Sequence, residues 1–106
     1  FSVGTVRDTA LFFRLGYADS QEKNYLKTHA VGDICSRFFD KDGNISSQEL
    51  NDRTVGIDLD DLRHKEYSIL LSGGDGKIAS IRAALKGGYA NVLITDQFTA
   101  KKLLAE

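Results

Sequence analysis

Residues 67–96 read YSILLSGGDGKIASIRAALKGGYANVLITD, and this stretch decides the fold. It begins and ends with runs of aliphatic and β-branched residues, 67–71 and 91–95, which are typical of buried strands. Between them, apolar residues recur at the spacing of one helix face, and glycine pairs stand where a strand or helix should end. Asp96 then follows the second strand and can cap a final helix. Strand, helix, strand and helix in this order predict an α/β fold with a parallel sheet.

The residues before this stretch predict a less regular part of the chain. Asp19 and Glu22 have capping-box spacing, which predicts a helix to about residue 29 with Tyr25 and Leu26 turned inward. Asp58 is expected to cap a short helix that ends near residue 65. The other expected elements are a strand end over 1–4, a helix over 5–15, a strand over 30–40, a hairpin turn over 42–44 and an extended segment over 51–57.

The composition restricts the classes of function. The chain has 106 residues and a net charge of −1, so it is one domain or part of one, without the basic surface typical of proteins that bind nucleic acid or anionic membranes. No apolar run reaches the length of a membrane span. The single cysteine, Cys35, cannot form an internal disulfide, which fits the reducing cytoplasm. Since the chain contains no methionine, we expect it to be a portion of a longer protein.

One stretch resembles a calcium-binding EF-hand loop, but only at its start. Asp40, Asp42 and Asn44 fit loop positions 1, 3 and 5. However, Ile45 stands where the turn glycine is needed, and Arg53 stands where a bidentate glutamate is needed. The alternative is a turn between two strands, and the sequence favours it.

Two further motifs carry no chemistry on their own. SGGDGK lacks the first glycine and the final hydroxyl residue of a phosphate-binding P-loop. His29 and His64 are isolated at polar helix ends, so they do not form a metal site. We therefore expect neither a metal nor a cofactor.

Five residues are candidates for binding a small molecule. Gly4, Gly73 and Gly74 fall at the expected carboxyl ends of strands, where the ligands of open parallel sheets bind. Lys77 lies in the first turn of the next helix, where a bound phosphate or carboxylate would offset the unfavourable helix dipole; alternatively, it points to solvent. Asp33 interrupts an apolar strand, so it either faces solvent, pairs locally or accepts hydrogen bonds from sugar hydroxyls.

Four segments together resemble the SorC-type bacterial transcriptional regulators, a family that includes the central glycolytic gene regulator and the deoxyribonucleoside regulator. They occur in the order of that family, and the resemblance extends over essentially the whole chain. The segments are AVGDICSRFFDKDGN (30–44), ELNDRTVGIDLDDLR (49–63), SGGDGKIASIRAALKGGYANVLITD (72–96) and TAKKLL (99–104).

The resemblance implies that residues 1–106 form the C-terminal part of a sugar-binding effector domain. The implied fold has a parallel-sheet, Rossmann-like core of the sugar-phosphate isomerase and deaminase type, with a β-hairpin insertion. Asp33 then corresponds to an acidic contact to the sugar hydroxyls and Lys77 to a lysine contact, while the segment around Gly4 lines the same pocket. The DNA-binding helix-turn-helix of the family is not in this chain.

The implied function is that of a cytoplasmic sensor rather than an enzyme. A phosphorylated sugar would bind and change the affinity of a homo-oligomer for operator DNA, through a domain outside this chain. The alternative is a sugar-phosphate isomerase or deaminase of the same fold, in which Asp33 and Lys77 form an acid/base pair.

Overall fold

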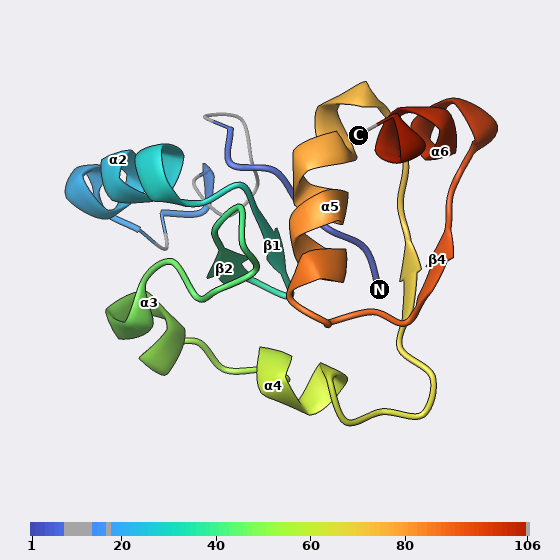
Figure 1. Cartoon of the computed structure of the whole chain (residues 1–106). Coiled ribbons are helices and arrows are strands. Elements are labelled where there is room, and N and C mark those ends of the chain that lie inside the picture. Colours follow the sequence, from blue (N-terminus) through green and yellow to red (C-terminus); the bar gives the residue numbers. More distant parts are fainter. Residues whose placement is uncertain (8–13, 17, 106) are drawn as a thin grey trace.

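The computed structural model describes residues 1–7, 14–16 and 18–105. Its elements are short and lie around one central helix, α5, as Figure 1 shows. In chain order they are α2 (Ser20–His29), β1 (Gly32–Ile34), β2 (Arg37–Phe39), α3 (Gln48–Asp52), α4 (Leu59–Leu62), β3 (Ile69–Leu71), the 3-10 turn η1 (Asp75–Lys77), α5 (Ile78–Lys86), β4 (Val92–Ile94) and α6 (Gln97–Leu104). The helix expected over 5–15 falls largely outside the described residues.

The strand, helix, strand, helix unit is confirmed. β3 and β4 pair in parallel, with Leu70 opposite Leu93, and α5 connects them. The Asp96 side chain caps α6 by accepting the backbone N–H of Thr99 at 2.8 Å. The chain is therefore a mixed α/β domain with a parallel strand pair, whereas the isomerase and deaminase type of core stays a prediction.

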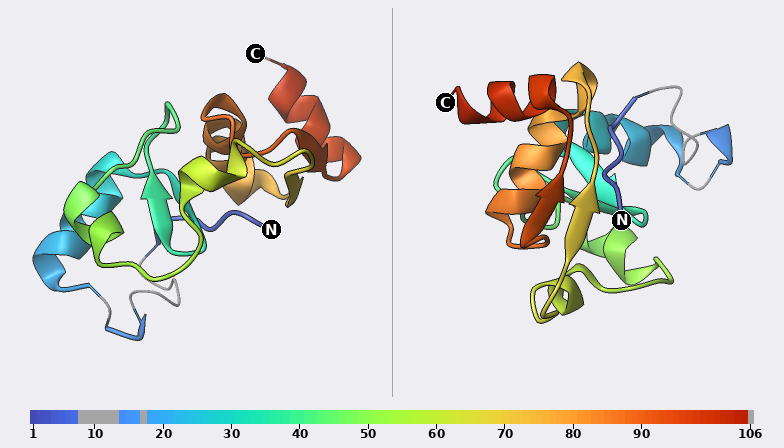
Figure 2. Two further views of the ribbon diagram at one scale, coloured as in Figure 1. Left: turned by 90° about the horizontal axis from the view of Figure 1, so that it is seen from below. Right: turned by 90° about the vertical axis from the view of Figure 1, so that its right-hand side faces the viewer.

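The first four residues connect the pair of β3 and β4 to strand β1. Phe1 donates its amino group to the Ile69 carbonyl at 3.1 Å and accepts the Leu71 N–H at 2.8 Å, the pattern of a parallel neighbour to β3. Gly4 then forms an antiparallel bridge with Asp33 of β1. Figure 2 shows this N-terminal segment, in blue, running past β3. The end of the N-terminal segment is thereby fixed beside β1.

The single strand expected over 30–40 is wrong, because the chain reverses in its middle. β1 and β2 form an antiparallel hairpin joined by Cys35 and Ser36, whose φ angles are 52° and 67°. Two left-handed residues give the twist that a two-residue hairpin loop needs, although Asn and Gly are the usual residues there. Asp33 supports the turn, since its Oδ2 accepts the Ser36 N–H at 3.1 Å.

The expected turn over 42–44 is confirmed, and it uses the oxygens that suggested calcium. Asp40 Oδ1 accepts the backbone N–H groups of Asp42 and Asn44 at 2.9 and 3.0 Å. Asp42 pairs with Lys86 at 2.7 Å, and this contact lowers the pKa of the Asp42 carboxyl. These carboxylates therefore hold a turn and an ion pair.

The extended segment expected over 51–57 is also wrong. α3 includes its first two residues, and the rest is a loop in which Val55 is 99% exposed. The buried Arg37 side chain holds this loop by donating to the carbonyls of Asn51, Gly56 and Ile57 at 2.6, 3.1 and 3.2 Å. The alternation of apolar residues in the loop thus does not reflect burial.

Two helix predictions need smaller corrections. The capping box of Asp19 and Glu22 and the burial of Leu26 are confirmed, but Tyr25 is 45% exposed rather than inward. Asp58 stands at the N-cap of α4, yet its side chain makes no capping hydrogen bond.

The main core leaves one face of the parallel pair uncovered. Leu70 of β3 and Ile81 of α5 are fully buried in it. On the other face, Ile69, Leu71 and Ile94 are 42%, 61% and 51% exposed. Parallel sheets are normally buried on both faces, so this bare face is unusual for a complete domain. No helix of the described ranges is long and apolar enough to cross a membrane.

Candidate functional site

Asp33 lies on β1, and its carboxylate occupies the space where a side chain of Gly4 would stand. A side chain at Gly4 would begin with a Cβ only 2.0 Å from Asp33 Oδ1 and 3.1 Å from its Cγ. The other carboxylate oxygen, Oδ2, accepts the Ser36 N–H. The Asp33 side chain is thus bonded to the backbone of the hairpin turn and lies against Gly4 rather than free in solvent.

Lys77 faces the same place. It lies where η1 passes into α5, it is half-buried, and its Nζ donates to the Val3 carbonyl at 2.5 Å. Val3 directly precedes Gly4, so the ammonium group approaches the residue against which Asp33 rests. Burial raises the pKa of the Asp33 carboxyl, and the Lys77 charge is near enough to oppose that rise. The alternative in which Lys77 points to solvent does not hold.

The electrostatics of Asp33 suit a buried acceptor. Burial raises the pKa of the Asp33 carboxyl, because the charged form loses solvation there. The Ser36 N–H and the Lys77 charge oppose this shift without cancelling it. An ionised carboxylate with few hydrogen-bond donors around it gains from any hydroxyl that is brought to it. Sugar hydroxyl groups are donors of this kind.

Gly73 and Gly74 lie elsewhere, at the carboxyl end of β3 beside α6. A Cβ at Gly73 would lie 2.5 Å from Asp96 Oδ2. The Gly74 N–H donates to Thr99 Oγ1 at 2.8 Å, and that hydroxyl donates to Asp96 Oδ2 at 2.8 Å. The backbone and side-chain donors of Thr99 lower the pKa of Asp96. The packing of α6 thus explains Gly73, whereas Gly74 is explained by its φ angle of 109°, since a Cβ there would meet no atom within 4 Å.

A shallow groove of about 450 Å³ borders this second cluster. It lies at the carboxyl ends of β3 and β4, where ligands of parallel sheets bind. Its lining residues are Leu71, Ser72, Gly73, Ile94, Thr95 and Asp96. The structure therefore brings Asp33, Lys77 and Gly4 together, while Gly73 belongs to this neighbouring groove.

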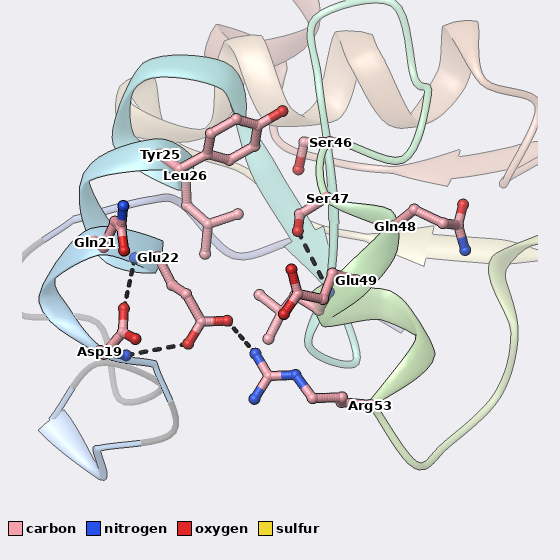
Figure 3. Close-up of a pocket in the computed structure, with 11 residues that line it drawn as sticks. Asp19, Gln21, Glu22, Tyr25, Leu26, Ser46, Ser47, Gln48, Glu49 and Arg53 are labelled. Carbon is pink, nitrogen blue, oxygen red and sulfur yellow. Dashed lines mark hydrogen bonds and ion pairs between the residues drawn. The ribbon is translucent and has the colours of Figure 1, made fainter.

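A larger pocket, of about 660 Å³, lies between α2 and α3 (Figure 3). Three of its charged groups satisfy one another: Glu22 closes the capping box with Asp19 and also pairs with Arg53. The pocket contains neither Asp33 nor Lys77. No group of three His, Cys, Asp or Glu side chains in the described part of the chain could hold a metal ion. We place the candidate site at Asp33 because Lys77 and Gly4 both lie against it.

Sequence reasoning missed the residues that hold Asp33. Ser36 acts through its backbone N–H, which no side-chain pattern reveals. Ser80, on α5, donates to the Val31 carbonyl at 2.8 Å and packs against Gly32. The one available signal was Gly32 itself, since a glycine inside a strand often marks a close approach of another element.

The comparisons with known proteins agree with one another. Residues 1–105 match the family model described as "Putative sugar-binding domain". The chain is 64% identical over 104 residues to the deoxyribonucleoside regulator of Bacillus subtilis strain 168, and this match covers 98% of this chain and 33% of that protein. The chain therefore spans about a third of the length of this relative.

Solved structures give the same result. A transcriptional regulator from Streptococcus pneumoniae TIGR4 superposes with a TM-score of 0.88 at 33% identity, over 97% of this chain and 40% of that one. The full-length sorbitol operon regulator SorC from Klebsiella pneumoniae superposes with a TM-score of 0.84 at 36% identity, over 97% of this chain and 33% of that one.

Proposed function

This chain belongs to the family of sugar-binding domains of SorC-type transcriptional regulators, and on that premise we propose that it senses a phosphorylated sugar for a longer regulator. The observation that carries the proposal is the convergence of Asp33 and Lys77 beside Gly4. The carboxylate accepts hydrogen bonds from sugar hydroxyls, and the ammonium group attracts a phosphate or hydroxyl oxygen.

The rest of the regulator completes the proposal. Binding of the sugar changes the affinity of a homo-oligomer for operator DNA in the cytoplasm, through a helix-turn-helix domain outside residues 1–106. The relatives are named as transcriptional regulators, which favours sensing over turnover. In this proposal Asp33 and Lys77 bind the sugar without acting as an acid/base pair.

We also propose that residues 1–106 are the C-terminal part of a larger effector domain. The bare face of β3 and β4 supports this, because three aliphatic side chains there lack the cover that a parallel sheet normally has. The relatives are about three times as long as this chain, so they contain ample sequence to supply that cover.

Calorimetric titration of the full-length protein with phosphorylated sugars, such as ribose 5-phosphate and glucosamine 6-phosphate, tests the function. Lys77→Ala should weaken binding of the active sugar phosphate about tenfold or more, because a hydrogen bond to a charged group contributes roughly 1.5–3 kcal/mol. Lys86→Ala is the matched control, since Lys86 lies at the opposite end of α5 from Lys77 and pairs with Asp42. Unchanged affinity in Lys77→Ala would refute the site, and turnover of the sugar would refute sensing alone.

A further inference from the structure

We propose that Gly4 is a positioning residue, kept free of a side chain so that the Asp33 carboxylate can occupy that space and present itself to the sugar hydroxyls. The proposal rests on the sugar-sensing function proposed above, and it adds a reason why this position is glycine.

The backbone of Gly4 does not itself require glycine. Its φ angle lies outside the left-handed region, unlike those of Gly43 and Gly74 at 85° and 109°. Its hydrogen bonds are ordinary ladder bonds: the N–H donates to the Asp33 carbonyl at 2.8 Å, and the carbonyl accepts the Asp33 N–H at 3.3 Å. A residue other than proline could make these bonds, and its φ angle would not be in the left-handed region.

Among the described residues, it is the space beside Gly4 that excludes a side chain. The three atoms nearest to an added Cβ all belong to the Asp33 carboxyl group, Oδ1 at 2.0 Å, Cγ at 3.1 Å and Oδ2 at 3.6 Å. Real Cβ atoms do not approach other atoms to 2.0 Å, so an alanine here must displace this carboxylate. A side chain at position 4 would therefore disturb the site first of all through Asp33.

The carboxylate is held from the opposite side as well. The Ser36 N–H donates to Oδ2 from a turn whose two residues are left-handed without being glycine, a conformation that is strained unless its surroundings hold it. One oxygen is therefore tied to the turn while the other lies over Gly4. Fixing the acceptor before the ligand arrives removes part of the ordering cost of binding. The ligand that such an acceptor selects is one that offers hydroxyl donors.

A double-mutant cycle in the full-length protein tests the proposal. Gly4→Ala should weaken binding of the active sugar phosphate by about tenfold to a hundredfold, the range expected when a charge-assisted hydrogen bond is lost. In an Asp33→Ala background, the same Gly4→Ala change should alter affinity less than about twofold, because the carboxylate that it displaces is already gone. Gly76→Ala is the control, since a Cβ at Gly76 meets no atom within 4 Å and its φ is not left-handed.

Thermal unfolding of the four proteins in the cycle, namely the native protein, Gly4→Ala, Asp33→Ala and the double variant, provides the second measurement. Gly4→Ala should lower the melting temperature when Asp33 is present and leave it unchanged when Asp33 is alanine. Native affinity in Gly4→Ala, or an equal loss in both backgrounds, would overturn the proposal. If the native protein binds no phosphorylated sugar, the proposed function fails. The melting temperatures then still decide whether Gly4 makes room for Asp33, by whether the effects of the two substitutions add.

Discussion

Gly32→Ala should both destabilise the protein and weaken its binding of the effector. Gly32 is the buried residue that precedes Asp33 on β1. An added Cβ would lie 2.6 Å from the Gly4 carbonyl oxygen, 2.6 Å from Ser80 Oγ and 2.8 Å from Ser80 Cβ. The shortest of these is about 0.8 Å less than the 3.4 Å at which ordinary contact begins.

Neither neighbour can move away cheaply. The Gly4 carbonyl belongs to the bridge with Asp33, and Ser80 is 1% exposed, with its hydroxyl bonded to Val31. Overpacking a core site of this kind costs about 1–3 kcal/mol. Loss of the Ser80 hydrogen bond adds roughly 1 kcal/mol if that side chain rotates. We therefore expect Gly32→Ala to lower the free energy of unfolding by about 2–4 kcal/mol.

The effect on binding follows from the same displacement. When β1 relieves the contact with Ser80 by moving away from α5, Asp33 moves with it. A shift near 1 Å in a group that must meet a ligand can reduce its effect by a factor of about a hundred, so we expect at least a tenfold loss of affinity. Urea unfolding and calorimetry of the full-length protein measure the two quantities, with Gly76→Ala as the control. A destabilisation below about 0.5 kcal/mol together with native affinity would refute the packing argument.

Three further predictions concern other parts of the molecule. Asp33→Asn should raise the melting temperature at neutral pH while weakening sugar binding. Because burial raises the pKa of Asp33 in the folded state, the stability of the native protein falls as the pH rises through that raised pKa. The advantage of the variant should therefore shrink in melting curves taken at acidic pH. Leu71→Asp should strongly destabilise or aggregate the full-length protein, because we expect the sheet face of Leu71 to be covered in that protein. Unfolding and light scattering measure the two effects, and Val55→Asp, in the exposed loop, should be tolerated. Tyr89→Phe should cost about 1–3 kcal/mol in urea unfolding, since the buried Tyr89 hydroxyl donates to the buried Gly43 carbonyl, and a value near zero would mean that water replaces that bond.

The last forty residues could be predicted because their signals are local. Each strand ends at a glycine or a capping residue, and the apolar face of α5 is encoded within one helix. The hairpin of β1 and β2 could not be predicted in this way. Cys35 and Ser36 are unusual residues for a left-handed turn, and the turn is supported by the Asp33 carboxylate, which accepts the Ser36 N–H. The loop after α3 was misread for a similar reason, since Arg37 holds it from a distant strand.

The sequence could propose residues for the candidate site but not their geometry. Asp33 and Lys77 were each singled out by a residue type in an unexpected place, and the family resemblance gave both a role. Their meeting depends on the first four residues, which pair with β3 through Phe1 and with β1 through Gly4. No periodicity in the sequence encodes that register.

The glycines show most clearly why a strand-end glycine alone does not identify a ligand site. Gly4, Gly73 and Gly74 were predicted by one argument, that glycine lets a ligand approach the backbone. In the structure, the side-chain space of Gly4 is filled by Asp33, that of Gly73 is filled by the capping residue of α6, and Gly74 has a φ of 109° that favours glycine in any protein. The Asp96 carboxylate already accepts the backbone N–H and the hydroxyl of Thr99, so the contact of Gly4 with Asp33 is the one that bears on the candidate site. A substitution at Gly4 should therefore change affinity through Asp33, whereas one at Gly73 should act mainly on the start of α6.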